Sequence, residues 1–311
     1  MNRLSILILL SLVTSLFSCE KEFIPKGSNL PPKIVVEGYI EAGDRPTPPY
    51  VILTRSLSFF SELSAEQLEN SFVHDAIVRV SDGERVATLT EVCLDELNSE
   101  QKALAGELFG LDTDSLGFNF CVYIDLTFSI TGEEGRTYTL EVDADGEQVS
   151  ASTTIPFRVP LDSLRFRDPP GMPVDTLAQL LCQLSDPPGI ANFYRYQVAI
   201  NDGAFIPASA SVLDDRLFDG KTTEFPLFRP EARGADSFDL ETFGLYRVGG
   251  RVTIKWITLD EAHYNFWNTL EYNASNQGPF SNYTLVESNI EGGLGIWGGL
   301  SASYYELPVQ K

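Results

Sequence analysis

The sequence predicts a mainly β protein, in which an N-terminal immunoglobulin-like β-sandwich is followed by a second β-rich domain with one helix. Two observations support this fold class. Short runs rich in β-branched and aromatic residues recur from residue 33 onward, and Gly, Pro, Asp or Asn bounds each run. The hydrophobic fraction is 43%, with 20 Phe and 12 Tyr, so the chain can bury a large core and we do not expect disorder.

The first residues have the pattern of an export signal. Arg3 gives a positive start, residues 4–17 are almost wholly apolar, and Ser18 stands directly before Cys19. The apolar run is shorter than the ~20 residues that a membrane-spanning helix needs. This order resembles a bacterial lipoprotein signal, so we predict a signal peptide over 1–18 and a Cys19 that is acylated, for example with palmitate. A plain secretory signal or an uncleaved anchor would begin in the same way.

Residues 19–32 predict a tether, because they are polar, contain three prolines and show no periodicity. The charge of the whole chain then limits its partners. With 44 acidic and 22 basic residues the formal net charge is −22. Nucleic acid and anionic membrane surfaces would repel such a protein, so we expect no nucleic-acid partner.

The predicted sandwich occupies residues 33–157. Several of its β runs alternate apolar with polar residues, as half-buried antiparallel strands do. Tyr138 stands at the head of the last run, where a tyrosine corner is expected. Asp-Gly pairs at 82–83 and 145–146 predict two hairpin turns. The runs are 34–40, 50–54, 76–80, 86–90, 122–130 and 137–142.

Two insertions, 57–72 and 94–116, interrupt this rhythm. The first contains a short helix signal at 64–68. Both are long enough to be functional loops, and both could equally be decorations without a function.

A proline-rich segment at 155–160 marks the boundary to a second domain, residues 158–311. One helix is predicted near 258–274, because residues 258–261 form a capping-box pattern and apolar residues then recur at helical spacing. His263 falls on or near that apolar face, which favours a packed histidine over a catalytic one. The β runs of this domain are 162–167, 177–184, 194–200 and 251–257.

The cysteines predict one disulfide. Cys93 ends one predicted strand and Cys121 opens the next, so the two bracket an insertion as cross-strand neighbours would. An exported protein meets an oxidising compartment, and a bridge closing such a loop stabilises by on the order of 3 kcal/mol. We therefore predict a Cys93–Cys121 disulfide and a free, buried thiol at Cys182.

No catalytic constellation is visible. The two histidines, His74 and His263, lie far apart, and neither has a second histidine or cysteine at metal-ligand spacing. We expect no enzyme, no cofactor and no metal site. Acidic residues are numerous enough to form pairs, so a surface hydrolase acting on glycans or peptides through paired carboxylates stays as the alternative.

The C-terminal segment contains a misleading motif. Residues 293–298 match the dinucleotide fingerprint, yet only 13 residues follow Gly298, which leaves no room for the rest of that fold. We interpret its glycines as positions that allow tight turns or a close backbone approach. Candidate ligand or partner contacts are aromatic, although aromatic residues in β domains are more often core. They are Tyr194, Tyr196, Trp297 and Tyr304.

Four separated segments, in this order, resemble the DUF4249 family of Bacteroidota lipoproteins: 34–38 (IVVEG), 186–195 (DPPGIANFYR), 214–220 (DDRLFDG) and 288–298 (SNIEGGLGIWG). The resemblance covers about residues 19–311. It implies an outer-membrane lipoprotein that assists a TonB-dependent β-barrel receptor in substrate capture or uptake, without established catalytic residues. Residues 19–22 (CEKE) are also similar to signals that send lipoproteins of this phylum to the cell surface, so we expect surface exposure.

Overall fold

The computed structural model describes residues 31–57, 64–113, 115–171, 174–231, 241–275 and 284–311. The predicted signal peptide and Cys19 lie outside the described residues. Lys33–Ser56 and Leu63–Lys311 form one compact unit, and it is this unit that we describe. None of the described helices is both long and apolar enough to cross a membrane.

The prediction of a mainly β chain is confirmed, with strands distributed over several sheets. In the first half the strands are β1 (Ile34–Gly43), β2 (Tyr50–Arg55), β3 (Ile77–Ser81), β4 (Val86–Thr88), β5 (Thr90–Cys93), β6 (Cys121–Ile124), β7 (Thr137–Ala144) and β8 (Glu147–Thr154). In the second half they are β9 (Ser163–Arg167), β10 (Leu177–Ser185), β11 (Phe193–Ile200), β12 (Ile206–Asp214), β13 (Thr222–Leu227), β14 (Tyr246–Arg247), β15 (Arg251–Leu259) and β16 (Leu294–Pro308).

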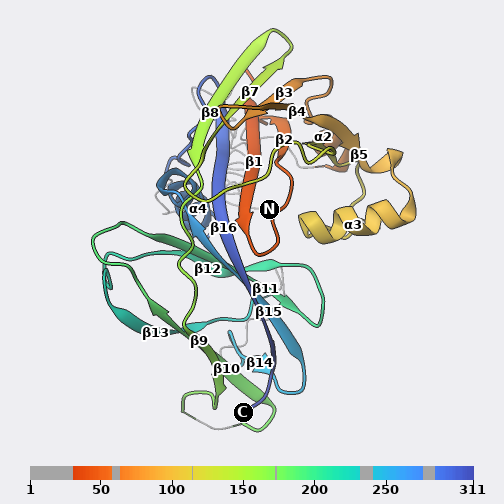
Figure 1. Ribbon diagram of the computed structural model, residues 1–311. Coiled ribbons are helices and arrows are strands. Elements are labelled where there is room, and N and C mark those ends of the chain that lie inside the picture. Colours follow the sequence, from red (N-terminus) through yellow and green to blue (C-terminus); the bar gives the residue numbers. More distant parts are fainter. Residues whose placement is uncertain (1–30, 58–63, 114, 172–173, 232–240, 276–283) are drawn as a thin grey trace, which may run out of the picture. The chain divides into compact units, whose positions relative to one another are not determined.

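The largest sheet has eight strands in the order β12-β11-β15-β16-β1-β2-β6-β5. Its centre is a parallel pair of the first and last strands, in register from Val35 opposite Leu294 to Gly43 opposite Ala302. Figure 1 shows this pair as the red and blue ribbons lying side by side. Gly295 makes the close approach possible, because at its φ of 107° a Cβ would lie only 1.9 Å from the Val36 carbonyl oxygen.

Two four-stranded sheets cover one face of the large sheet. The first, β4-β3-β7-β8, encloses a core with β1 and β2 around Trp297 and Tyr138. The second is β13-β10-β14, with β9 also paired to β10, and it encloses a core with β11 and β15 around Trp256. The predicted boundary near 157 falls between the two smaller sheets, whereas the large sheet takes strands from both sides of it. The division into two domains stays a prediction.

The other face of the large sheet carries two helices. α4 (Glu261–Ser275) lies over β11, β12 and β16, close to the predicted 258–274. Its cap is Asp260 rather than Thr258, because Thr258 still belongs to β15 and the Asp260 carboxylate accepts the amide of His263 at 2.8 Å. α3 (Ser99–Phe109) lies in the 94–116 insertion, after a 3-10 turn at Leu94–Glu96.

Three local predictions are confirmed. A short helix, α2 (Ala65–Glu69), forms in the first insertion behind the N-cap Ser64. Asp145 and Gly146 both have positive φ in the β7–β8 hairpin. The Tyr138 hydroxyl donates to the carbonyl of Thr131 at 2.9 Å and accepts the amide of Glu133 at 2.9 Å, which is a tyrosine corner.

The predicted strand 122–130 is wrong beyond Ile124. Asp125 ends β6, because its carboxylate accepts the amides of Thr127 and Ile130, both at 3.0 Å, and so folds the chain into a turn.

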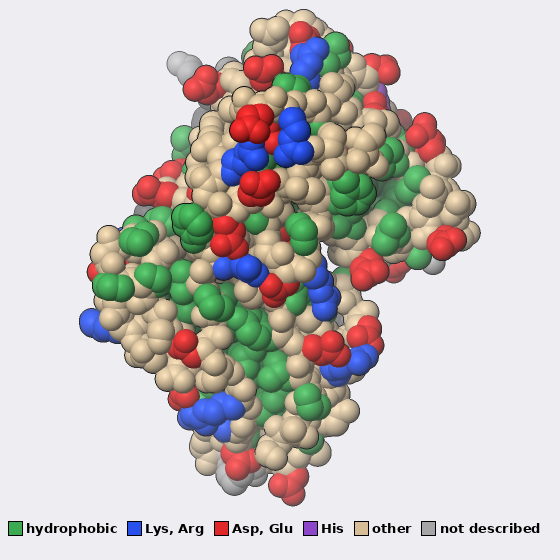
Figure 2. Space-filling model, in the orientation of Figure 1, with side chains coloured by type: hydrophobic (Ala, Val, Ile, Leu, Met, Phe, Trp, Pro, Cys, Tyr) green, Lys and Arg blue, Asp and Glu red, His purple; other side chains and the backbone are tan. Residues whose placement is uncertain are grey.

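Acidic and basic side chains lie side by side on the face drawn in Figure 2. Among the ion pairs of the described chain, the guanidinium of Arg136 lies 3.4 Å from Asp82 and 3.3 Å from Glu84. The excess of negative charge is therefore partly offset by local ion pairs, each of which is worth little where it is exposed.

Candidate functional site

Three of the four aromatic residues predicted to form a contact surface are buried instead. Tyr194 is 0%, Tyr196 4% and Trp297 0% exposed. All three point from the large sheet into the two cores, where Tyr194 stacks on Trp256 at 5.2 Å and the Trp297 indole donates to the Tyr138 carbonyl at 3.2 Å. The prediction is wrong for these residues, because period-two alternation places them on the inner face of their strands.

Tyr304 is the exception, since it lies on the opposite face of the sheet and stays partly exposed. Its hydroxyl donates to Glu41 at 3.1 Å, and Lys255 pairs with the same carboxylate at 2.6 Å. The guanidinium of Arg45 lies 4.7 Å from the centre of the Tyr304 ring. This face of the sheet carries polar groups, whereas the inner face is largely apolar.

A larger polar group lies on the same face, under α4, and we call it the sheet-face polar cluster. Side chains meet there because paired residues share a face, as Tyr39 does with Tyr50, and because residues 263, 267 and 271 follow one side of α4 at four-residue spacing. The cluster consists of Glu37 and Tyr39 from β1, Tyr50 from β2, Arg195 from β11, and His263, Trp267 and Glu271 from α4.

Arg195 is the central cation of the cluster and is only 6% exposed. Its guanidinium stacks on Trp267 at 3.6 Å from the ring centre, and its Nε donates to Ser211 at 3.0 Å. The nearest oxygen of Glu271 is 3.7 Å from Nη2, which is an ion pair without a hydrogen bond. Within the described residues, neither terminal nitrogen of Arg195 makes a hydrogen bond, so both can bind another group.

Glu37 and Tyr50 are partly exposed, although their surroundings are desolvating. Burial raises the pKa of Glu37, against the opposing effects of the Tyr39 hydroxyl, which donates to it at 3.1 Å, and of Arg195. Burial likewise raises the pKa of Tyr50 far above its usual value, with help from Glu37. The Tyr50 hydroxyl bonds to no described residue. Polar groups that are reachable yet poorly solvated are typical of binding sites.

His263 is packed, as the sequence predicts. It is 1% exposed and stacks on Tyr39, with 5.2 Å between ring centres. Burial, followed by the positive charge of Arg195, lowers its pKa to about 3, so the ring is neutral at physiological pH. Its Nε2 and the Nε1 of Trp267 are buried and have no hydrogen-bond partner among the described residues.

Aromatic residues from outside the cluster border it. Phe109, at the end of α3, packs edge-on against Tyr50 with 5.0 Å between ring centres. Phe205, in the β11–β12 hairpin, packs in the same way against Tyr304 at 5.7 Å. The end of α3 and the β11–β12 hairpin lie close together, since a Cβ on Gly110 would lie 3.5 Å from the Phe205 carbonyl oxygen.

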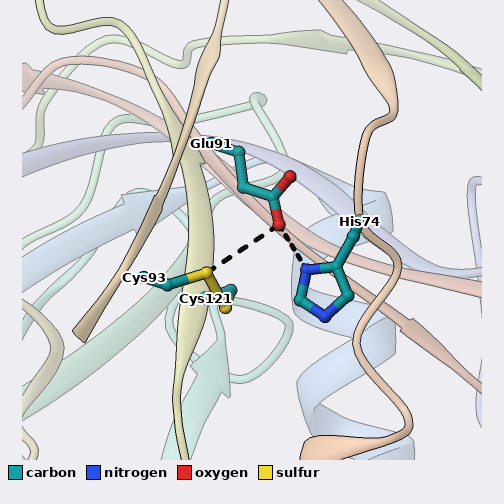
Figure 3. Close-up of side chains that lie close together, drawn as sticks. All are labelled: His74, Glu91, Cys93 and Cys121. Atoms are coloured by element: carbon teal, nitrogen blue, oxygen red, sulfur yellow. Dashed lines mark hydrogen bonds and ion pairs between the residues drawn. A yellow bond between two sulfur atoms is a disulfide. The ribbon is translucent and has the colours of Figure 1, made fainter. Parts of the chain in front are cut away.

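Cys93 and Cys121 are joined by a disulfide between directly opposed residues of β5 and β6. His74 and Glu91 lie beside it (Figure 3), and the ligand atoms of these four residues are all within 4.8 Å of one another. Cys182 is a free, buried thiol, and burial raises its pKa to about 12. It is therefore unreactive at neutral pH.

Asp186, Asp215 and Asp219 form a second group, within the described chain, that could hold a cation. Each carboxylate already accepts a backbone amide: Asp186 from Gly220 at 3.2 Å, Asp215 from Asn192 at 2.6 Å and Asp219 from Gly189 at 2.7 Å. These bonds tie the 186–192 and 214–220 loops together. They give the acidic residues a structural role without a metal.

Sequence reasoning missed the cluster, although a signal for it was present. Glu37 and Arg195 are charged residues inside largely apolar strands, where a charge needs a partner or a function. Both also belong to segments on which the family resemblance depends, as does Gly298, which lies against His263. Three distant segments of the chain thus meet at one place.

Comparison with known proteins identifies a family. A search of curated proteins found no match. The family model described as "Domain of unknown function (DUF4249)" matches residues 20–306. This match covers nearly the whole chain, including every residue of the sheet-face polar cluster, and the chain therefore belongs to the DUF4249 family.

Proposed function

We propose that this chain is an exported, lipid-anchored binding protein of the outer membrane, which captures a small polar ligand at the sheet-face polar cluster for a TonB-dependent β-barrel transporter. One observation carries the proposal. The terminal nitrogens of Arg195, the Tyr50 hydroxyl, the His263 Nε2 and the Trp267 Nε1 have no hydrogen-bond partner among the described residues, although the cluster is poorly solvated.

The energetic argument is that an unpaired polar group in a desolvated place costs roughly 1–3 kcal/mol. Four polar groups that lack hydrogen bonds to described residues at one place are a cost that a ligand with complementary donors and acceptors would remove. The aromatic borders would meanwhile contact its apolar surface. Glu37 supports the same function, because it is partly exposed and has one carboxylate oxygen that accepts no bond from the described residues.

Support for export and anchoring comes from the lipoprotein-like pattern ending at Cys19, and from a disulfide that suits an oxidising compartment. Support for the transporter partner comes from the family resemblance alone. Loss of membrane attachment and of palmitate labelling in Cys19→Ala would test the anchor, and an unchanged distribution would contradict it.

The binding site can be tested without knowing the ligand. The mature protein is isolated from its own membranes in mild detergent and analysed by native mass spectrometry, which detects a co-purifying small molecule as added mass. Tyr50→Phe is the sharpest variant, because it removes a hydroxyl that bonds to no described residue and should leave the fold unchanged. Glu37→Gln removes charge at nearly constant volume.

We expect the added mass to be lost in both variants and kept in Tyr305→Phe. The Tyr305 hydroxyl accepts the Leu161 amide at 2.8 Å, away from the cluster. Added mass that survives both cluster variants would place the ligand elsewhere. Mild crosslinking in the same membranes should capture a β-barrel partner. The alternative is tested with a panel of glycans and peptides. Hydrolysis products that disappear when one carboxylate is changed would show that the protein is a hydrolase rather than a binding protein.

A further inference from the structure

The four residues around the disulfide have a chemistry of their own. Cys93 and Cys121 are opposed on β5 and β6, and Glu91 precedes Cys93 by two residues, which places both on one side of β5. His74 comes from the segment before β3. Figure 3 shows the Glu91 carboxylate between the Cys93 sulfur and the His74 ring, in contact with both. Two sulfurs, one imidazole and one carboxylate are the kinds of donor that Zn²⁺ prefers.

We propose that His74, Glu91, Cys93 and Cys121 form a zinc site that is closed while the disulfide is intact and opens when a dithiol reductant cleaves it. A tetrahedral zinc with bonds of about 2.0–2.3 Å holds its ligand atoms roughly 3.3–3.8 Å apart. The four ligand atoms already lie within 4.8 Å of one another. Small movements of side chains would therefore complete the site.

Glu91 is held in position for this role. Its Oε2 accepts the amide of Asp75 at 3.0 Å and lies 3.1 Å from the Tyr123 hydroxyl. Its Oε1 is left to face the site, 2.6 Å from His74 Nδ1 and 3.9 Å from the Cys93 sulfur. Groups that fix a ligand from behind in this manner are the usual second layer of a metal site.

His74 provides the entry path. Its side chain is 51% exposed, whereas that of Glu91 is 21% exposed and both cysteines are buried. A zinc ion arriving from solvent would first meet the imidazole and then displace it from its contact with Glu91. The ion would be held by two strands and the segment before a third.

The redox step balances. Two electrons and two protons from the dithiol reductant convert the disulfide to two thiols, and the reductant becomes a disulfide. Binding of Zn²⁺ then releases both thiol protons to solvent, since zinc binds the thiolate. The bound site carries two thiolates, one carboxylate and a neutral imidazole.

The experiment uses the mature protein and Zn²⁺ alone. Zinc affinity is measured by competition with a chromophoric chelator, before and after reduction with a non-thiol phosphine. Circular dichroism reports whether the reduced chain is folded. We expect one zinc per reduced chain and none in the oxidised chain. Co²⁺ in its place should give a thiolate-to-cobalt absorption band.

The variants test each ligand. Tyr123→Phe removes a group behind Glu91 and should weaken zinc about 10-fold, and His74→Ala, which removes a ligand, should weaken it by more than about 100-fold. Glu141→Gln and Cys182→Ala change residues that, within the described chain, form no hydrogen bond or ion pair with the four ligands, and they should leave zinc affinity unchanged. Zinc binding that ignores His74 and Glu91 would overturn the proposal. So would a reduced chain that binds no zinc, whether it stays folded or fails to refold when zinc is added.

Discussion

Gly298 of β16 lies directly against the imidazole ring of His263. A Cβ built on Gly298 would lie 2.5 Å from Nδ1 and 2.7 Å from Cε1 of that ring. The ring also stacks on Tyr39, which is paired with Gly298 across β1 and β16. The absence of a side chain at Gly298 therefore determines how closely α4 can lie on the sheet, and with it the position of Trp267 and Glu271.

Gly298→Ala should destabilise the fold by about 1–3 kcal/mol, because the added methyl group must displace a packed ring. Urea denaturation measures the loss. Combining it with His263→Ala removes the obstacle, so the double variant should lose less free energy of unfolding than the sum of the two single variants. Simple additivity would show that the contact does not limit the packing of α4.

The buried His263 predicts a loss of stability in mild acid. Burial, with Arg195 as the second cause, lowers its pKa from 6.5 to about 3. The unfolded chain binds a proton near pH 6.5 that the folded chain cannot bind, so stability is complete above that pH and declines as the pH falls toward 3. The expected slope is about 1.4 kcal/mol per pH unit. Urea denaturation between about pH 7 and pH 5 measures it, and His263→Gln should flatten the slope over this range. An equal slope in both proteins would contradict the assignment.

The Lys255–Glu41 ion pair should depend strongly on both partners. Its side chains are 14% and 5% exposed, and Lys255 Nζ lies 2.6 Å from the carboxylate. Lys255→Met leaves a buried carboxylate without its cation and should destabilise by roughly 3–5 kcal/mol. The double variant with Glu41→Gln should recover a large part of this loss in thermal or urea unfolding. If Lys255→Met alone had no effect, the pair would be solvated in solution.

The two tyrosines Tyr138 and Tyr50 should respond differently to loss of the hydroxyl. In Tyr138→Phe the Glu133 amide and the Thr131 carbonyl lose their partner, at a cost of about 1–3 kcal/mol. Tyr50→Phe removes a hydroxyl that bonds to no described residue and should be nearly neutral. Parallel urea denaturation compares them, and a large destabilisation by Tyr50→Phe would show that its hydroxyl has a structural partner.

Local signals predicted much of the fold but not its centre. Alternation, Asp-Gly turns and capping residues located most strands, α2, α4 and the tyrosine corner. They missed β16, because a segment rich in glycine is not predicted as a strand from its own residues. The glycines are needed because Gly295 lies against β1 and Gly298 lies against His263, and both of these neighbours are distant in sequence. α3 was missed for a different reason: Asn98 and Gln101 form a capping box, but the helix has no buried residue and so no apolar stripe.

The candidate site shows the same limit. We selected Tyr194, Tyr196 and Trp297 from the sequence because they are aromatic. Alternation along a strand, however, does not say which face of the large sheet the two smaller sheets cover. Of the four aromatic residues predicted from the sequence, Tyr304 alone lies on the polar face. Glu37 and Arg195 are on strands separated by more than a hundred residues, and only the strand order brings them together.

The parallel pairing of β1 with β16 has a consequence for how the protein is made. β1 can pair with β2 early, but its parallel neighbour β16 is made last, so the two halves of the large sheet cannot be joined during synthesis. Native contacts at such long sequence separation also form slowly. A chain that completes its fold late stays unfolded for longer, and an export channel that threads extended polypeptides requires an unfolded chain.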